Sequence, residues 1–273
     1  MSGNGGEDRM GGGLPLPAMT PQAGYRLLVV GGCGGMGRQL VRAGVGLGLD
    51  ICVLDLEASC SQTEKIAGVE YIPCNVSSEA DVTAAFARIG EKWDALDGLV
   101  NLVGYTGERV ALEDMETDGW HGIIDASLHG MFYVARAAAP LLRRAQEQGR
   151  QPAAVLVSST FGVRVAHTGY AAYAVAKAGV MNLVRALASE WSPAIRVNGI
   201  APGVIETAFL KGGTGRPEKK THLDIDRFMH TVPMERLGQP EEIVWPTLFL
   251  LGAGAGYITG QTLHVNGGTW MAA

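Results

Sequence analysis

The sequence is poor in charged residues and in cysteine. Charged side chains make up 18% of the 273 residues, which is low for a disordered or nucleic-acid-binding chain, and the net charge of −5 argues against nucleic acid or an anionic membrane as a partner. The cysteines form no CxxC pair, and no histidine lies at metal-ligand spacing from them. We therefore expect no metal site and free thiols in a reducing, cytoplasmic setting. The four cysteines are Cys33, Cys52, Cys60 and Cys74.

Targeting segments and long apolar runs are also missing. The chain does not open on a basic segment followed by an apolar run, so we expect no secretory signal. The most apolar late stretch, Thr247 to Ile258, is too short to span a bilayer and is interrupted by glycines. Apolar residues nevertheless make up 47% of the chain, enough for the core of a large α/β domain.

Two segments differ in composition from the rest. Residues 1–23 are rich in glycine and proline without an apolar period, which predicts a flexible tail that takes no part in the fold. A single domain, 24–273, follows. Within it, residues 206–231 contain a cluster of glycines and charges, which is typical of an active-site lid. Apolar residues of this segment suggest a pocket wall: Phe209, Leu210, Phe228 and Met229.

Short apolar runs alternate with helical patterns from residue 25 onward. This alternation implies right-handed crossovers and a parallel sheet. The predicted strands are Tyr25 to Val30, Asp50 to Leu54, Val69 to Cys74, Leu96 to Val103, Ala153 to Val157, Ile195 to Ile200 and Thr262 to Val265. The predicted helices cover residues 36–48, 80–93, 117–144, 169–190, 223–230 and 240–251.

A glycine-rich turn follows the first apolar run. Such a turn between strand and helix lets backbone N–H groups approach a pyrophosphate. Two dinucleotide-binding spacings fit the turn, and the residues alone do not choose between them. Gly32, Gly34 and Gly37 fit G-x-G-x-x-G, whereas Gly31, Gly35 and Gly37 fit G-x-x-x-G-x-G.

Asp55 ends the second predicted strand, roughly the expected distance after the glycine turn. A carboxylate there can accept hydrogen bonds from the adenosine ribose hydroxyls and would repel a 2′-phosphate. Asp55 therefore favours NAD over NADP, although Arg38 could soften this preference.

Tyr173 and Lys177 lie four residues apart on a predicted helix, so they share one face. A free phenol has a pKa of about 10, and a nearby cation lowers it. Such a pair can pass a proton to or from an alcohol oxygen. The hydroxyls of Ser158, Ser159 and Thr160 follow the fifth predicted strand, at the sheet edge where open α/β sheets bind ligands.

These motifs, taken in order, resemble the short-chain dehydrogenase/reductase family over about residues 25–270. The match also includes Asn101-Leu-Val-Gly104, Pro202-Gly203-Val-Ile-Glu-Thr207, Arg236-Leu-Gly-Gln-Pro-Glu-Glu242 and Tyr257-Ile-Thr-Gly-Gln. The resemblance selects the G-x-x-x-G-x-G spacing. It implies an α/β, Rossmann-type doubly wound, seven-stranded parallel sheet flanked by helices, and hydride transfer between a nicotinamide and an alcohol or ketone.

The resemblance also implies roles for individual residues. Tyr173 would be the general acid/base, Ser159 would hold the substrate oxygen, and Lys177 would bind the nicotinamide ribose and lower the pKa of Tyr173. Asn75 and Val76 would lie beside the adenine, and Ile205 and Thr207 would hold the carboxamide. The full set of implied cofactor contacts is Gly31, Gly34, Gly35, Met36, Gly37, Asp55, Asn75, Val76, Asn101, Gly104, Tyr173, Lys177, Pro202, Gly203, Ile205 and Thr207.

The sequence departs from the family pattern in several places. Val30 replaces a threonine, Asn75 an aspartate and Leu102-Val103 an asparagine and an alanine. Ser127 stands where the family usually has an asparagine that positions a water in the proton relay. We therefore expect Ser127 to bind this water less well and Ser127→Asn to raise turnover.

Three functions fit these residues. The leading one is an NAD-dependent alcohol dehydrogenase or ketone reductase. The second is an NADPH-dependent reductase of 3-oxoacyl thioesters, which Asp55 disfavours. The third is a non-catalytic dinucleotide-binding protein, against which the intact Ser159, Tyr173 and Lys177 argue. The resemblance further implies a homotetramer with the helices around 117–144 and 170–191 at an interface.

Overall fold

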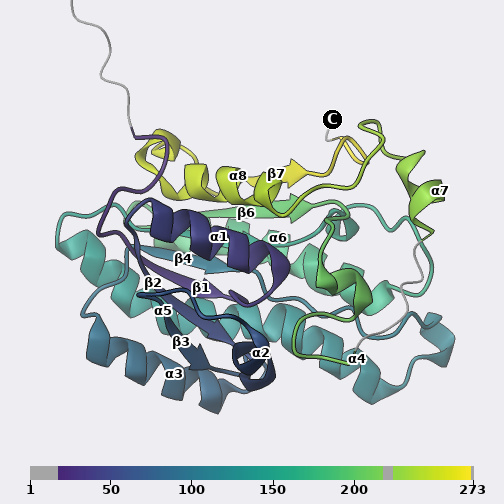
Figure 1. The fold of residues 1–273 in the computed structure, drawn as a ribbon, viewed down its shortest axis with the longest axis horizontal. Helices are drawn as coiled ribbons and strands as arrows, with labels where there is room; N and C mark the ends of the chain where they lie inside the picture. The colour runs from purple at the N-terminus through teal and green to yellow at the C-terminus, as the bar shows by residue number, and fades with distance from the viewer. Residues whose placement is uncertain (1–17, 218–223, 272–273) are drawn as a thin grey trace, which may run out of the picture.

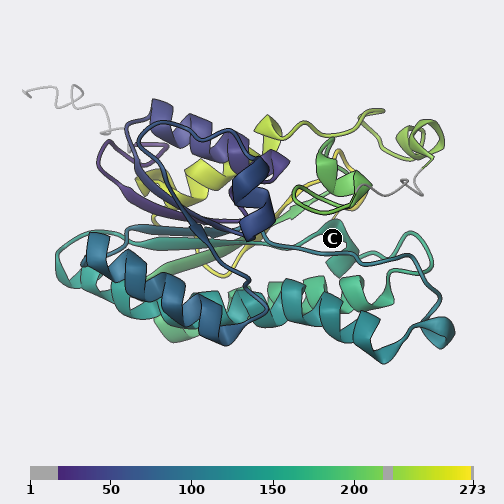
Figure 2. The same cartoon turned by 60° about the horizontal axis from the view of Figure 1, so that its bottom comes forward.

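The computed structural model describes residues 18–217 and 224–271, which form a parallel sheet covered by helices on both faces (Figures 1 and 2). The sheet has seven strands in the order β3-β2-β1-β4-β5-β6-β7, and every neighbouring pair is parallel. The predicted doubly wound Rossmann-type fold is thus confirmed. The strands are β1 (Arg26–Val30), β2 (Asp50–Asp55), β3 (Glu70–Pro73), β4 (Gly98–Asn101), β5 (Ala153–Val157), β6 (Arg196–Pro202) and β7 (Thr262–Val265).

Two helical layers cover the sheet. Helices α1 (Gly35–Gly46), α2 (Glu57–Gln62) and α8 (Glu241–Leu251) lie on one face, and α3 (Glu79–Lys92), α4 (Thr117–Ile124), α5 (Gly130–Glu147) and α6 (Ala171–Trp191) lie on the other (Figure 2). The short α-helix α7 (Ile225–Met229) lies beyond the sheet on the side where β6 ends (Figure 1).

The central strands are apolar on both faces because both are covered. In β1, Leu28 and Val30 pack into the core on the α3–α5 side, while Leu27 and Val29 pack into the core on the α1–α8 side. All four are fully buried. Burying each such side chain contributes about 1.5–3 kcal/mol, so this strand anchors both layers.

Several element boundaries differ from the sequence prediction. The stretch 117–144, predicted as one helix, consists of α4, a π-helical turn (Asp125–His129) and α5, which continues to Glu147. Helix α2 was not predicted because it has only six residues and no side-chain cap. Residue 223, the predicted start of the helix at 223–230, lies outside the described residues.

The predicted boundary of the N-terminal tail, after residue 23, is placed too late in the sequence. Residues 18–23 contact the domain: the backbone N–H of Gly254 donates to the carbonyl oxygen of Ala18 at 3.0 Å, and Pro21 is buried. Residues 1–17 of the predicted tail lie outside the described residues, as do residues 218–223 of the predicted lid.

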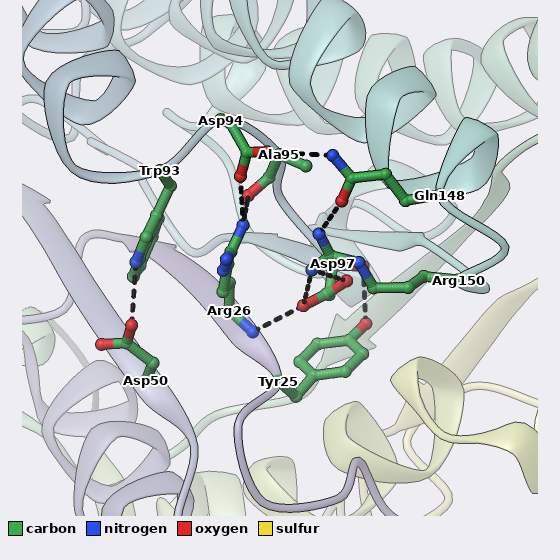
Figure 3. Close-up of polar contacts among 9 residues, drawn as sticks. All are labelled: Tyr25, Arg26, Asp50, Trp93, Asp94, Ala95, Asp97, Gln148 and Arg150. Atoms are coloured by element: carbon green, nitrogen blue, oxygen red, sulfur yellow. Dashed lines mark hydrogen bonds and ion pairs between the residues drawn. The ribbon is translucent and has the colours of Figure 1, made fainter.

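A polar network closes the sheet edge where the strands begin (Figure 3). The Asp97 carboxylate accepts hydrogen bonds from the backbone N–H of Arg26 at 2.8 Å and from the Arg150 guanidinium at 2.9 and 3.0 Å. The Tyr25 hydroxyl donates to the carbonyl oxygen of Asp97 at 2.7 Å. Beside this group, the Trp93 indole N–H donates to the Asp50 carboxylate at 2.8 Å. The polar groups at this edge pair with one another, whereas the cavities described below lie at the opposite edge.

No helix in the described ranges combines the length and the apolar character needed to cross a membrane.

Candidate active site

A large cavity and a smaller one lie next to each other at the sheet edge where the strands end. The large cavity, of about 800 Å³, is lined by residues that follow β5 and β6 and by the first turns of α6. The smaller one, of about 130 Å³, lies over the glycine turn and the ends of β2 and β3, and we call it the glycine-loop cleft. The two cavities share wall residues and therefore adjoin one another. The shared residues are Met36, Leu102, Gly104, Thr207, Phe209 and Gly212.

The glycine turn has little room for side chains. A Cβ atom on Gly37 would lie 2.2 Å from the carbonyl oxygen of Gly31, and one on Gly35 would lie 2.6 Å from Thr207 Cγ2. Gly31 has φ +82°, a left-handed conformation that favours glycine. Gly31, Gly35 and Gly37 therefore each have a steric reason to be glycine, as does Gly32, whose Cβ atom would lie 2.6 Å from Val53 Cγ1. A Cβ atom on Gly34, the middle glycine of the G-x-G-x-x-G spacing, would come no closer than 3.5 Å to the Gly31 carbonyl oxygen.

Helix α1 begins at the cleft. Its N-cap, Gly34, supplies no side chain to satisfy the backbone N–H groups of the first turn. Such a helix start attracts an anion, because its N–H groups and the helix dipole both favour negative charge.

Asp55 reaches the cleft from the end of β2. Its carboxylate accepts hydrogen bonds from the backbone N–H groups of Cys33 at 2.9 Å and Leu56 at 2.8 Å, which fix its orientation. Burial raises the pKa of Asp55, and the two backbone hydrogen bonds oppose this rise. Arg38, the cation that could soften the NAD preference, has Glu64 at 3.6 Å.

Most predicted cofactor residues line one of the two cavities, but Asn101 does not. Asn101 is 0% exposed at the end of β4, where its side-chain oxygen accepts the Val103 N–H at 3.1 Å. Its side-chain nitrogen has no hydrogen-bond partner among the described residues. Asn101 therefore supports the 102–104 segment from beneath and is not a cavity wall.

Ser159, Tyr173 and Lys177 meet on one wall of the large cavity. The Ser159 hydroxyl accepts the Phe161 N–H at 3.2 Å and also interacts with the Tyr173 hydroxyl. Lys177 is 2% exposed, and its ammonium group donates to the carbonyl oxygens of Val157 at 2.9 Å and Val103 at 3.1 Å. The helical spacing thus brings together the predicted side chains.

The expected effect of Lys177 on Tyr173 is not found. Burial raises the pKa of Tyr173 to about 12, and the hydrogen bond with Ser159 opposes this rise only in part. Burial also lowers the pKa of Lys177 to about 7. The orientation of the Lys177 side chain explains the missing effect. Its nitrogen faces two carbonyl oxygens and lies 5.8 Å from the centre of the Tyr173 ring. Tyr173 is therefore a protonated phenol at neutral pH, suited to donating a proton.

Ser127 does not face either cavity. It is 0% exposed in the π-helical turn, where its hydroxyl accepts the Tyr105 N–H at 3.0 Å and donates to the Tyr105 carbonyl oxygen at 3.2 Å. The hydroxyl proton is thus used to anchor the segment after β4, which does not fit the predicted contact with a relay water.

Several wall residues of the large cavity have no sequence motif. Aromatic rings of Phe161, Tyr170, Phe209 and Phe228 line it, and His167 presents a buried Nε2 atom without a hydrogen-bond partner in the described residues. Phe209, Leu210 and Phe228 thus occupy the predicted wall, whereas Met229 is not part of it. Thr160 also lines the cavity, but its hydroxyl donates to the Pro202 carbonyl oxygen at 3.0 Å.

Residues 212–216, which we call the cleft strap, cover the glycine-loop cleft. The Ser59 hydroxyl of α2 donates to the carbonyl oxygen of Thr214 at 2.9 Å. Gly215 packs so closely that a Cβ atom there would lie 2.5 Å from the Ser59 nitrogen. The Arg216 guanidinium lies 4.0 Å from the centre of the Tyr105 ring. Part of the predicted lid is therefore a wall of the cleft.

The two cavities fit a dinucleotide. The uncapped start of α1 suits the pyrophosphate, Asp55 suits a ribose, and Asn75 and Val76 line the far end of the cleft. Ile205 and Thr207 line the large cavity beside Lys177 and Tyr173. Within the described residues, no group of three or more histidine, cysteine or acidic side chains could hold a metal ion.

Comparisons with known proteins agree with this arrangement. A family model described as enoyl-(acyl carrier protein) reductase matches residues 31–269. A probable 2,4-dienoyl-CoA reductase of Bacillus subtilis is 32% identical over 260 residues, covering 90% of this chain and 96% of its own length. A 3-oxoacyl-(acyl-carrier-protein) reductase of Staphylococcus aureus is 32% identical over 252 residues, covering 89% and 97%.

Solved structures give the same result. The 3-ketoacyl-(acyl-carrier-protein) reductase of Brucella melitensis, complexed with NADH, superposes with a TM-score of 0.82 at 26% identity and covers 91% of this chain and 99% of its own. The matching fold, the glycine turn and the grouped Ser159, Tyr173 and Lys177 lead to one conclusion: the chain belongs to the short-chain dehydrogenase/reductase family of oxidoreductases.

Proposed function

We propose that the protein is an NAD-dependent oxidoreductase that interconverts a secondary alcohol and a ketone, with Tyr173 as general acid/base. One observation carries the proposal. Ser159, Tyr173 and Lys177 converge on a cavity of about 800 Å³ that shares its wall with the glycine-loop cleft. A substrate oxygen beside Tyr173 and a cofactor in the cleft would therefore be neighbours.

Ser159, Tyr173 and Lys177 have different roles in the proposed reaction. A bound nicotinamide supplies or accepts the hydride. The hydroxyls of Ser159 and Tyr173 interact with each other, so both can reach one substrate oxygen. In reduction, the Tyr173 phenol donates its proton to that oxygen; in oxidation, the phenolate removes it. Lys177 holds the cofactor ribose.

Asp55 supports NAD as the cofactor. Its carboxylate lines the cleft and is held by two backbone N–H groups, so it can receive ribose hydroxyls but would repel a 2′-phosphate. With NAD, the cellular cofactor ratio would favour oxidation of the alcohol. Arg38 has Glu64 as a partner, which reduces its value as a phosphate anchor.

The cavity wall supports a substrate with an apolar body and one polar group. Phe161, Tyr170 and Phe209 supply the apolar surface, and the Ser159 and Tyr173 hydroxyls supply the polar contact.

A second function has specific support from the comparisons. Relatives named 3-oxoacyl-(acyl-carrier-protein) reductase match nearly the whole chain, and the large cavity has room for an acyl group. This alternative requires NADPH to be accepted despite Asp55.

Melting temperature in the presence of each cofactor tests the proposal, because a ligand that binds the folded state raises it. We expect NAD to stabilise the protein and NADP to have little effect. Turnover is then measured with secondary alcohols and NAD, and with acetoacetyl-CoA and NADPH. Tyr173→Phe should lose turnover while keeping the NAD-induced shift.

The other outcomes select the alternatives. Stabilisation mainly by NADP with thioester turnover would replace the proposal by the second function. An NAD-induced shift without any turnover would favour a non-catalytic dinucleotide-binding protein.

We also propose a homotetramer in which α5 and α6 form an interface. Each helix leaves an apolar side chain at the surface, Phe132 at 43% exposure on α5 and Val175 at 51% on α6. Light scattering should give four times the 28.7 kDa chain mass. Val175→Glu should reduce this mass, whereas Leu112→Glu, at another exposed site, should not.

A further inference from the structure

Two thiols lie side by side under the glycine turn. The Cys33 and Cys60 sulfur atoms are 3.9 Å apart, and Cys33 donates a hydrogen bond to Cys60. Cys60 Sγ also lies 3.7 Å from the carbonyl oxygen of Asp55. Cys33 belongs to the glycine turn and Cys60 to α2, so the pair joins two elements that border the cleft.

The other two cysteines differ from this pair. Cys52 and Cys74 are buried in the core on the α3–α5 side of the sheet, whereas Cys33 and Cys60 lie in the core on the α1–α8 side. Neither Cys52 nor Cys74 forms a sulfur–sulfur hydrogen bond with any residue in the described ranges. The sequence alone gave no reason to pair any of the four.

The surroundings of the two thiols shift their pKa values in opposite directions. The hydrogen bond from Cys33 lowers the pKa of Cys60, while the same bond and burial raise the pKa of Cys33. Both side chains are buried, Cys33 at 0% exposure and Cys60 at 3%. Cys60 is therefore the better nucleophile of the pair, because the thiolate is the reactive form.

We propose that Cys33 and Cys60 are a dithiol modification site that a peroxide converts to a disulfide, and that the disulfide weakens dinucleotide binding. The Cys60 thiolate attacks one peroxide oxygen and breaks the O–O bond, giving a sulfenic acid and one water after protonation. The Cys33 thiol then attacks the sulfenic sulfur and displaces the second water. Two thiols lose two electrons and two protons, and one hydrogen peroxide becomes two waters.

The geometry links the disulfide to the cleft. The sulfur atoms must close from 3.9 Å to a bond of about 2.05 Å, by rotation of the two side chains and by a shift of whichever element is less confined. The glycine turn is confined: a Cβ on Gly32 would lie 2.6 Å from Val53 Cγ1, and Gly37 packs on Gly31. Helix α2 is short and uncapped, so it is the element that shifts.

A shift of α2 changes the cleft on two sides. The helix carries Ser59, which holds the cleft strap through the Thr214 carbonyl oxygen. The N-cap of α2, Leu56, donates its backbone N–H to the Asp55 carboxylate, the proposed ribose ligand, at 2.8 Å. The disulfide therefore draws the strap and the glycine turn together and displaces Asp55 from its ribose-binding position.

The test uses the full chain, with hydrogen peroxide as oxidant and NADH as probe. We expect the intact mass to fall by about two units, peptide mapping to link Cys33 to Cys60, and the NADH dissociation constant to rise about tenfold. Dithiothreitol should reverse all three changes. Melting temperature is recorded in both states, so that unfolding is distinguished from a local change.

Two variants test whether the bond between Cys33 and Cys60 causes the loss of NADH affinity. Cys60→Ser cannot form the bond and should keep its mass and its NADH affinity in peroxide. Cys52→Ala removes a cysteine outside the pair and should still form the disulfide. Mass gain without a cross-link, a cross-link that leaves NADH affinity unchanged, or equal loss of affinity in Cys60→Ser would each overturn the proposal. If the reduced protein does not bind NADH, the second part of the proposal, that the disulfide weakens dinucleotide binding, is wrong.

Discussion

The protonation state of Tyr173 sets how each direction of the reaction depends on pH. Because burial raises the pKa of this phenol to about 12, the proton-donating form dominates at neutrality. Ketone reduction uses that form, so titration of Tyr173 should not change its kcat/KM from about pH 6 to pH 9, whereas loss of the Lys177 proton near pH 7 should lower it. Alcohol oxidation uses the phenolate and should rise about tenfold per pH unit over the same range.

Rate profiles in both directions check this expectation. An oxidation rate that levels off near neutrality would show that the pKa of Tyr173 is low in the cofactor complex. That outcome would restore the role first assigned to Lys177 from its spacing, with the ammonium turned from the carbonyl oxygens toward the phenol.

A second residue-scale prediction concerns Gly37. Its missing Cβ would lie 2.2 Å from the Gly31 carbonyl oxygen, so Gly37→Ala must displace the backbone of the glycine turn. We expect a loss of about 1–3 kcal/mol in the free energy of unfolding and loss of the NAD-induced melting shift. Gly46→Ala, in the same helix with open space around the added atom, is the matched control and should not destabilise. Equal effects of the two variants would contradict the steric argument.

At the scale of elements, the π-helical turn depends on Ser127. Ser127→Ala leaves the partly buried Tyr105 N–H without its partner, which costs about 1–3 kcal/mol and loosens the segment between β4 and the large cavity. We expect a lower melting temperature and a lower kcat. Ser127→Asn should also lower both, because the site is fully buried and an asparagine does not fit the two bonds to Tyr105. A faster Ser127→Asn enzyme would support the water relay inferred from the sequence.

The same element shows what the sequence could predict. The strand and helix order followed from local apolar patterns, and β5 and β7 were predicted to the residue. The π-helical turn was missed because it depends on Tyr105, 22 residues earlier. Tyr173 and Lys177 line the same cavity, as their helical spacing predicted, but the direction of the Lys177 side chain depends on carbonyl oxygens from two other segments. Contacts between residues that are close in the sequence can be predicted from it, whereas contacts between residues that only the fold brings together cannot.

At the scale of the whole molecule, one edge of the sheet contributes stability and the opposite edge carries the cavities. The Asp97 network holds together the edge opposite the cavities (Figure 3). Asp97→Ala leaves the Arg26 N–H unpaired and removes the partner of Arg150, so we expect a loss of about 3 kcal/mol of stability. NAD affinity of the folded protein should not change. Asp94→Ala, at an exposed ion pair with Arg26, should have little effect on either quantity. Weaker NAD binding by Asp97→Ala would show that the two edges are coupled.

The shared wall of the two cavities has a consequence for the order in which ligands arrive. Thr207, Phe209 and Gly212 face both spaces, and the strap that continues from them is fastened to α2. A dinucleotide in the cleft would therefore border the same residues that the second reactant meets in the large cavity. For the proposed activity we expect an ordered kinetic mechanism, in which the nucleotide binds first and leaves last.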